Sequence, residues 1–221
     1  VLVYAAYNEI DEARYIAGRI RKWVDDGGLR SAVAVLYRSN AQSRVFESTF
    51  NENRIPYRVY GGLRFFERAE IKDALAYLRL TLNPADDASF ERIVNHPPRQ
   101  IGERTVDMLR QIARTENRPL WEVAGEAVDS GEFTPRAAGA IGRFIQLIER
   151  MAQNIQGIPL AEQVEAVVAL SRLKDYFKTK EKGEQGQARV DNLNELISAA
   201  QSYVQVQVEE MPDMDELSAF L

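Results

Sequence analysis

The chain has 221 residues and is 45% hydrophobic, which suits one large domain or two small ones with a substantial core. Its 28 Lys and Arg against 33 Asp and Glu give a net charge of −5, which argues against a wholly basic nucleic-acid binder but leaves room for local basic patches. The absence of cysteine rules out disulfides and thiolate metal sites and fits a reducing compartment. No apolar run approaches the ~20 residues of a membrane span and no signal peptide is visible, so we expect a soluble, cytoplasmic protein without a membrane partner.

The first part of the chain predicts a small α/β arrangement. The segments that predict strands are Val1–Ala6, Ala32–Tyr37 and Tyr57–Tyr60. Helices are expected after Asn8 or Asp11 and over Gln42–Asn51. This alternation is typical of a parallel sheet covered by helices. Because the strands are few and no initiator methionine is present, we expect a piece of a larger sheet and an excised piece of a longer protein.

Beyond Arg64 the sequence predicts helices only. The segments with helical apolar spacing are Ala69–Leu82, Ala88–Asn95, Thr105–Thr115, Leu120–Ser130, Pro135–Asn154, Leu160–Leu170, Leu173–Thr179 and Val190–Val204. The expected fold class is therefore mainly α, with a small α/β N-terminal part followed by an all-helical domain. We expect the domains to span 1–65, 66–208 and 209–221, the last being an acidic, solvated linker and the start of a further helix.

Polar residues follow the second predicted strand at its carboxyl end. Arg38, Ser39 and Asn40 come directly after the apolar run. In open parallel sheets ligands bind beyond the carboxyl ends of the strands. A guanidinium suits a phosphate and an amide can bond a base edge or a sugar, which makes this loop a candidate nucleic-acid contact. The alternatives are a loop that only turns the chain and a surface ion pair.

A second candidate is the turn Pro97–Thr105. Two prolines end one helix, Gly102 permits a tight turn, and the next helix begins with unpaired N–H groups. Arg99 and Arg104 flank that point, so the turn could hold a phosphate without reading sequence. The alternative is a plain helix–turn–helix corner.

Other stretches are less specific. The basic, aromatic-containing stretch Arg172–Arg189 could contact DNA or be a solvated loop, and Lys180–Ala188 within it is expected to be a polar loop. The turn at Gly61-Gly62, with its cations and phenylalanines, could hold a phosphate backbone or simply be core and solvated charge. His96, the only histidine, is expected to be a turn residue without a metal.

One absence is informative for catalysis. The sequence has no Gly-x-x-x-x-Gly-Lys-Ser/Thr phosphate loop and no strand that ends in an acidic pair suited to magnesium. We therefore expect no catalytic residue and no ATP hydrolysis by this chain alone.

Four segments in register resemble UvrD/PcrA/Rep-type superfamily 1 DNA helicases: Leu36–Arg44, Tyr57–Arg79, Ile101–Thr105 and Glu181–Leu196. The first is similar to a motif of the second RecA-like motor domain, and the second to the passage from that domain into a large mobile insertion. The resemblance covers nearly the whole chain and is loose between residues 116 and 159. The family usually has Gly-Ile-Gly where this chain has Gln100-Ile101-Gly102.

The resemblance implies part of a second RecA-like domain plus the helical insertion of an ATP-dependent 3′-to-5′ DNA helicase that acts in DNA repair. It assigns single-strand contacts to Arg38, Asn40 and Ser43. The duplex contacts that we expect are Arg99, Gly102, Arg104 and Thr105. The insertion would swivel about Gly61, Gly62 and the Lys180–Ala188 connection.

The resemblance also sets the expected cofactors and partners. This chain needs none of its own, whereas the intact parent would use ATP and Mg; the partners would be single-stranded DNA, the duplex backbone and DNA repair proteins. Two other functions stay open: a protein-interaction module, and a helix–turn–helix regulator that reads bases through Thr105–Thr115. A backbone binder is salt-sensitive and sequence-blind, a regulator discriminates between sequences, and an interaction module ignores DNA.

Overall fold

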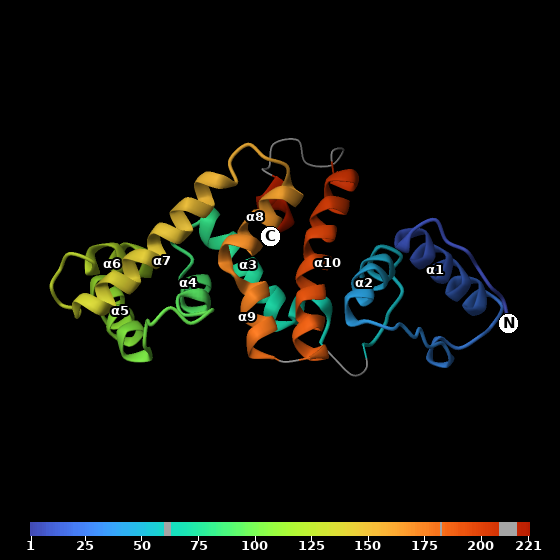
Figure 1. Ribbon diagram of the computed structural model, residues 1–221. Coiled ribbons are helices and arrows are strands. Elements are labelled where there is room, and N and C mark those ends of the chain that lie inside the picture. Colours follow the sequence, from blue (N-terminus) through green and yellow to red (C-terminus); the bar gives the residue numbers. More distant parts are fainter. Residues whose placement is uncertain (60–62, 182, 208–215) are drawn as a thin grey trace. The chain divides into compact units, whose positions relative to one another are not determined.

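The computed structural model describes residues 1–59, 63–181, 183–207 and 216–221, and the chain in it divides into two compact units (Figure 1). The first unit is Val1–Arg68 and the second is Ala69–Leu221. Each unit has its own core, and each is described by itself below. The predicted hinge residues Gly61 and Gly62 lie outside the described residues.

The first unit is built around two helices, α1 (Glu9–Asp25) and α2 (Ser43–Glu52). The Asn8 side chain accepts a hydrogen bond from the Asp11 N–H (2.8 Å) and so fixes the start of α1. Both helices are amphipathic, and their apolar faces meet in a shared core: Ala13, Ala17, Ile20, Val45, Phe46 and Phe50. Short 3₁₀ turns complete the unit at Arg30–Ala32, Asn40–Gln42 and Phe65–Glu67.

The predicted parallel sheet is wrong for the described residues, which contain no strand. Val33, Val35 and Tyr37 pack on the α1–α2 core, whereas Leu36 is 93% exposed. The apolar run 32–37 therefore buries one face only, instead of the two faces expected of a central parallel strand. No neighbouring segment in the described ranges pairs with its backbone, and without such a ladder an apolar run does not become a strand.

The second unit is wholly helical where it is described, which confirms the prediction of a mainly α chain. Its helices are α3 (Ala69–Leu82), α4 (Asp87–Ile93), α5 (Glu103–Glu116), α6 (Leu120–Ala127), α7 (Pro135–Asn154), α8 (Leu160–Ser171), α9 (Leu173–Lys180), α10 (Glu184–Gln207) and α11 (Glu216–Phe220). Local signals set many of the ends: the Thr134 hydroxyl accepts from the Ala137 N–H (3.3 Å), and Pro135 occupies the first turn of α7.

Helix α3 is the centre of this unit, because it packs against α4, α7, α8 and α10. Its buried residues include Ile71, Ala74, Tyr77 and Leu78, each with no exposed surface. Helix α7 extends from α6 at one end to α8 at the other (Figure 1). None of the helices in the described ranges is long and apolar enough to cross a bilayer.

The chain returns beside the point where it entered the second unit. Helix α10 packs against α8, α9 and α3, and it begins at Glu184, inside the segment Lys180–Ala188 that we predicted as a loop. That prediction was wrong for Glu184–Ala188, where polar residues and alanine form the first turn of α10 and the Gln187 side chain donates to Asp191 one turn later (2.8 Å).

Candidate nucleic-acid interface

The loop before α2 holds two of the predicted single-strand contacts in an open position. The backbone N–H groups of Arg38 and Ser39 both donate to Oε1 of Gln42, each at 3.0 Å. This capping arrangement fixes the loop and leaves the side chains of Arg38 and Asn40 exposed. Neither side chain has a hydrogen-bond partner within the described part of the chain. The loop therefore presents a guanidinium and an amide that are free to meet a ligand.

Ser43 differs from these two residues, because its side chain is buried. It is 1% exposed, and its Oγ lies 2.7 Å from Nη2 of Arg68, which donates to it. Nearby, the Glu47 carboxylate accepts from the Phe65 N–H (3.2 and 3.3 Å). These contacts tie the start of α2 to the end of the first unit. Ser43 is thus placed to position the loop and not to touch DNA directly.

Arg99 is also turned inward. Its Nη1 donates to the carbonyls of Ile93 and Pro97, both at 3.0 Å, and its Nη2 donates to the hydroxyl of Tyr77. The guanidinium lies over the rings of Tyr77 and Phe144, 5.5 and 5.7 Å from their centroids. With its donors used in this way, Arg99 holds the turn together from inside.

Tyr77 is the buried partner in this arrangement. Its hydroxyl donates to the carbonyl of His96 (2.6 Å) and accepts from Arg99. Burial raises the pKa of Tyr77 to about 12, although the neighbouring Arg99 charge works in the opposite direction. The neutral phenol is therefore the form that the folded chain requires.

The left-handed residue of the turn is Gln100, with φ 66°, and not Gly102, which is extended with φ −74°. The family's first glycine falls at this position, where glycine adopts positive φ without strain. Asn95 supports the turn, because its Oδ1 accepts from the N–H groups of Arg99 (2.7 Å) and Ile101 (3.3 Å). Gln100 thus replaces the glycine that the family usually has here and adopts the left-handed conformation with some backbone strain.

The start of α5 remains open. Gly102 is its N-cap, and a Cβ added there would meet no atom within 4 Å. Arg104 is exposed and makes no ion pair with any described residue, and Thr105 is half-buried. The N–H groups of Thr105 and Val106 bond to the Gly102 carbonyl (2.9 and 3.2 Å), whereas those of Glu103 and Arg104 have no partner among the described residues. This geometry admits a phosphate close to the backbone.

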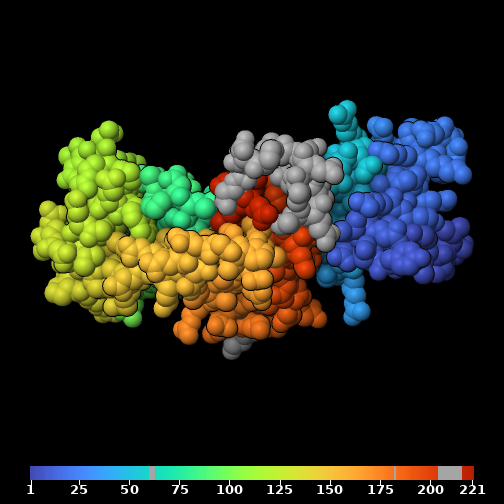
Figure 2. All heavy atoms as spheres, turned by 90° about the horizontal axis from the view of Figure 1, so that it is seen from above, coloured from blue at the N-terminus to red at the C-terminus, as the bar shows by residue number. Residues whose placement is uncertain are grey.

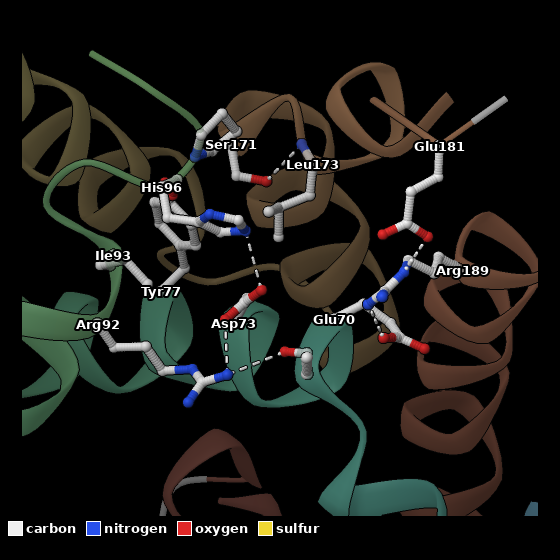
Figure 3. A network of polar contacts seen from close by, with 12 residues as sticks. Glu70, Asp73, Tyr77, Arg92, Ile93, His96, Ser171, Leu173, Glu181 and Arg189 are labelled. Carbon is white, nitrogen blue, oxygen red and sulfur yellow. Dashed lines mark hydrogen bonds and ion pairs between the residues drawn. The ribbon is translucent and has the colours of Figure 1, made fainter. Parts of the chain in front are cut away.

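A buried polar network that our sequence analysis missed closes the helical unit (Figure 3). Glu70, at the start of α3, is 4% exposed and accepts from Nη1 of Arg189 (2.8 Å) and Nδ2 of Asn192 (2.5 Å). Arg189 also donates through Nε to Glu181 (2.6 Å). The first turn of α3 is thereby bonded to α10, more than a hundred residues along the chain. All four residues lie in segments that carry the family resemblance, and that was the available signal.

One turn further along α3, Asp73 organises a second network. Its Oδ1 lies 2.8 Å from Nη2 of Arg92, and its Oδ2 lies 3.0 Å from Nε2 of His96 (Figure 3). The His96 ring meets Tyr176 edge-on, with ring centroids 4.8 Å apart. His96 lies in the turn after α4, as expected. Its ring in addition links Asp73 of α3 to Tyr176 of α9.

The basic stretch Arg172–Arg189 does not form one surface. Arg189 is paired inside the network above, Phe177 is buried, and the Lys180 ammonium lies 5.2 Å from the Tyr176 ring centroid. Among the described residues of this stretch, Arg172 lines a groove. The structure therefore places Arg172 and Arg189 in different surroundings, which composition does not reveal.

A nucleotide with its magnesium would need clustered carboxylates and a phosphate-binding loop. The described residues contain no group of three or more His, Cys, Asp or Glu that could hold a metal ion, and the sequence has no phosphate loop. The carboxylates of Glu70 and Asp73 are each paired with an arginine instead of being free to bind a metal ion. The described residues thus offer no cluster of ligands for the magnesium ion of a nucleotide.

Comparison with known proteins places the chain among the helicases. Its full length, residues 1–221, matches the model of the UvrD-like helicase C-terminal domain, and the chain belongs to that family. It is 47% identical over 221 residues to the DNA helicase II of Salmonella typhimurium and, equally, of Escherichia coli. It is 35% identical over 203 residues to the ATP-dependent DNA helicase PcrA of Bacillus subtilis. The chain spans 30% of the length of the two first relatives and 27% of the third.

Proposed function

We propose that the chain is the DNA-contacting part of an ATP-dependent 3′-to-5′ DNA helicase that acts in DNA repair. Membership of the UvrD-like family and the identity to proteins named DNA helicase II and PcrA support this function. Residues 1–65 would belong to the second RecA-like motor domain and 66–208 to a helical insertion that holds duplex DNA. Residues 209–221 would be the acidic linker that leads into a further helix. The protein would work in the cytoplasm, with DNA and repair proteins as partners.

Single-strand contact is proposed for Arg38 and Asn40. Both side chains are exposed on a loop whose backbone is fixed by Gln42, so a bound strand would meet groups that need little ordering. Ser43 would act indirectly, since its hydroxyl bond to Arg68 anchors the helix that carries the loop.

We propose that the start of α5 contacts duplex DNA. The open geometry of this helix start is the observation on which the proposed function rests. Gly102 leaves the backbone N–H groups accessible, Arg104 supplies an unpaired positive charge, and Thr105 supplies a hydroxyl. These groups recognise a phosphate and carry no base information, as a translocating enzyme requires. Arg99 would set the shape of the turn from inside, in place of the direct contact that the sequence suggested.

ATP and magnesium would be bound by the rest of the intact protein. The contribution of this chain would be to hold DNA and to close the helical unit on itself through Glu70 and Arg189. Movement of that unit would occur at Gly61-Gly62 and where the chain passes from α9 to α10. We expect no ATP hydrolysis by the purified chain, with or without DNA, and turnover that survives in a mutation-controlled preparation would contradict this division of labour.

Duplex binding by two variants tests the proposal. Gly102→Val should block close approach of a phosphate without backbone strain, because φ is −74° and a Cβ has open space. Arg104→Ala should weaken binding and lower the salt slope by about one unit, corresponding to one lost phosphate contact. Arg114→Gln, an exposed change on the same helix, is the control. Fluorescence anisotropy with a labelled duplex, at several salt concentrations, measures all three.

Wild-type slopes in both variants would show that the start of α5 is only scaffold. Melting temperatures close to wild type are needed to show that each variant is folded.

A further inference from the structure

A groove of about 930 Å³ lies in the helical unit, between α7, the loop Pro97–Gln100 and the corner where α8 meets α9. Figure 2 shows α7 in gold, extending along the helical unit from the α5–α6 helices towards α8. The groove is lined by basic, polar and apolar residues. The basic residues are Arg99, Arg143, Arg150 and Arg172, the polar residues are Gln100, Gln146 and Ser171, and the apolar residues are Pro97, Pro98, Ala140, Leu147, Ala169 and Leu170. No carboxylate is among these lining residues. The groove is therefore positively charged, although the chain as a whole has a net charge of −5.

The positions of the arginines converge on the groove. Arg143 and Arg150 are seven residues apart on α7, so they lie on one face of the helix, roughly 10 Å apart along its axis. Arg172 approaches from the other wall, at the left-handed residue (φ 60°) that joins α8 to α9. Arg99 also lines the groove, with its Nη1 donors bonded to the carbonyls of Ile93 and Pro97.

Arg143, Arg150 and Arg172 are exposed, and their side chains have no ion-pair or hydrogen-bond partner within the described ranges. By contrast, Arg110 and Arg189 of this unit are paired, the first with Glu91 and the second with Glu70 and Glu181. Three unpaired guanidinium groups around one hollow repel one another, and an anion in the groove would remove that repulsion. The groove is therefore charged for a ligand with several negative groups.

The kinds of side chain that line the groove also indicate which class of ligand it would bind. None of the lining residues is aromatic, so the groove lacks the stacking platforms that hold the bases of single strands. Guanidinium groups and side-chain amides suit phosphate oxygens, which arginine binds in bidentate fashion. Gln100 lines the groove and also belongs to the turn that leads into α5. The groove is thus continuous with the proposed phosphate contact at Gly102 and Arg104.

We propose that this groove holds the sugar–phosphate backbone of one strand of duplex DNA, with Arg143, Arg150 and Arg172 each contacting a phosphate. This inference rests on the proposed function and extends it: the duplex backbone would run from the start of α5, past Gln100, into the groove. Gln146 adds an amide donor between the two arginines of α7. The contacts would be sequence-blind, since every group addresses phosphate.

The test compares the 221-residue chain with the single variants Arg143→Gln, Arg150→Gln and Arg172→Gln and with the triple variant. Each loss of a phosphate contact should lower the salt slope of duplex binding by about 0.9. Three losses lower the slope by roughly 2.7, so the drop in affinity between 50 and 200 mM salt should be about 40-fold smaller in the triple variant than in wild type. Arg114→Gln is the charge-matched control, because Arg114 is exposed on α5 and does not line the groove. Circular dichroism melting shows whether each variant folds.

Three probes separate the outcomes: a labelled duplex, a single strand of the same length and an oligoglutamate peptide. A reduced duplex slope in the triple variant, with an unchanged control, supports the proposal. Normal duplex binding by the triple variant, together with weaker binding by Arg104→Ala, overturns the groove and leaves the proposed function intact. Failure of the wild-type chain to bind any duplex overturns both. Preferential binding of oligoglutamate that depends on the three arginines would assign the groove to an acidic protein segment and overturn the proposal.

Discussion

The buried pair Glu70–Arg189 gives a prediction in which the two partners are not equivalent. Glu70 has a side chain only 6% exposed, whereas the Arg189 side chain is 30% exposed and keeps Glu181 as a second partner. Arg189→Ala leaves a carboxylate buried with Asn192 as its remaining donor. Glu70→Ala leaves a guanidinium that can still reach Glu181 and water. We therefore expect the arginine deletion to be the more harmful one.

The magnitudes follow from burial. Removal of one partner from a buried pair costs about 3–5 kcal/mol, and the retained Asn192 bond puts Arg189→Ala at about 3–4 kcal/mol. Glu70→Ala loses the charge-assisted bonds from Arg189 and Asn192, which costs about 2 kcal/mol. The double variant should lie near 3 kcal/mol, since neither charge is then orphaned. The resulting coupling energy is about 2–3 kcal/mol.

Urea unfolding followed by tryptophan fluorescence measures this cycle. A Trp23→Phe background leaves Trp121, in α6, as the reporter of the helical unit. Arg118→Ala is the control, because Arg118 contacts Glu116, Glu122 and Glu126 on the surface, where ion pairs contribute little. A larger loss for Glu70→Ala than for Arg189→Ala, or additive losses, would refute the reasoning about where the buried charge lies.

Three further changes test other parts of the structure. Arg38→Ala and Asn40→Ala should each weaken single-strand binding by about 1–2 kcal/mol without a change in melting temperature, and unchanged affinity at low salt would leave them as surface residues. Gln100→Gly should stabilise the chain by up to about 1 kcal/mol in urea unfolding, because glycine relieves the left-handed backbone at φ 66°; a loss of stability would mean that the Gln100 side chain matters more than its backbone. Since the pKa of Tyr77 is raised from 10.0 to about 12, its contribution is complete below pH 10 and is lost as the pH rises towards 12, by about 2–3 kcal/mol; the difference between wild type and Tyr77→Phe should shrink over that range, and a constant difference would contradict the assignment.

The helices were predictable because their signals are local. The apolar spacing of Ala69–Leu82 and the Thr134-Pro135 start of α7 identify both helices with their observed ends. The sheet was mispredicted because a strand depends on a neighbour, and the apolar run 32–37 packs on helices α1 and α2 instead. Composition cannot show whether such an apolar run pairs with a neighbouring strand or packs on helices.

The residues of the candidate site also divide into those whose exposure fits the sequence interpretation and those whose contacts depend on the fold. Exposure of Arg38, Asn40 and Arg104 is compatible with the sequence interpretation, whereas Arg99 and Ser43 are occupied by partners that only the fold brings near. The Glu70–Arg189 pair was out of reach for spacing arguments, because more than a hundred residues separate its members. The Gln100 turn shows that a departure from a family glycine can be carried by backbone conformation alone.

The central claim is that the chain holds DNA through its backbone and without reading sequence. The most direct measurement is the affinity of the 221-residue chain for two duplexes of equal length and unrelated sequence, across a salt series. We expect equal affinities for the two duplexes, in the 10⁻⁴–10⁻⁶ M range of non-specific binding, with log K falling linearly as log salt rises. A clear preference for one sequence would indicate a base-reading regulator, and salt-independent or absent binding would indicate a protein-interaction module; either result would contradict the account.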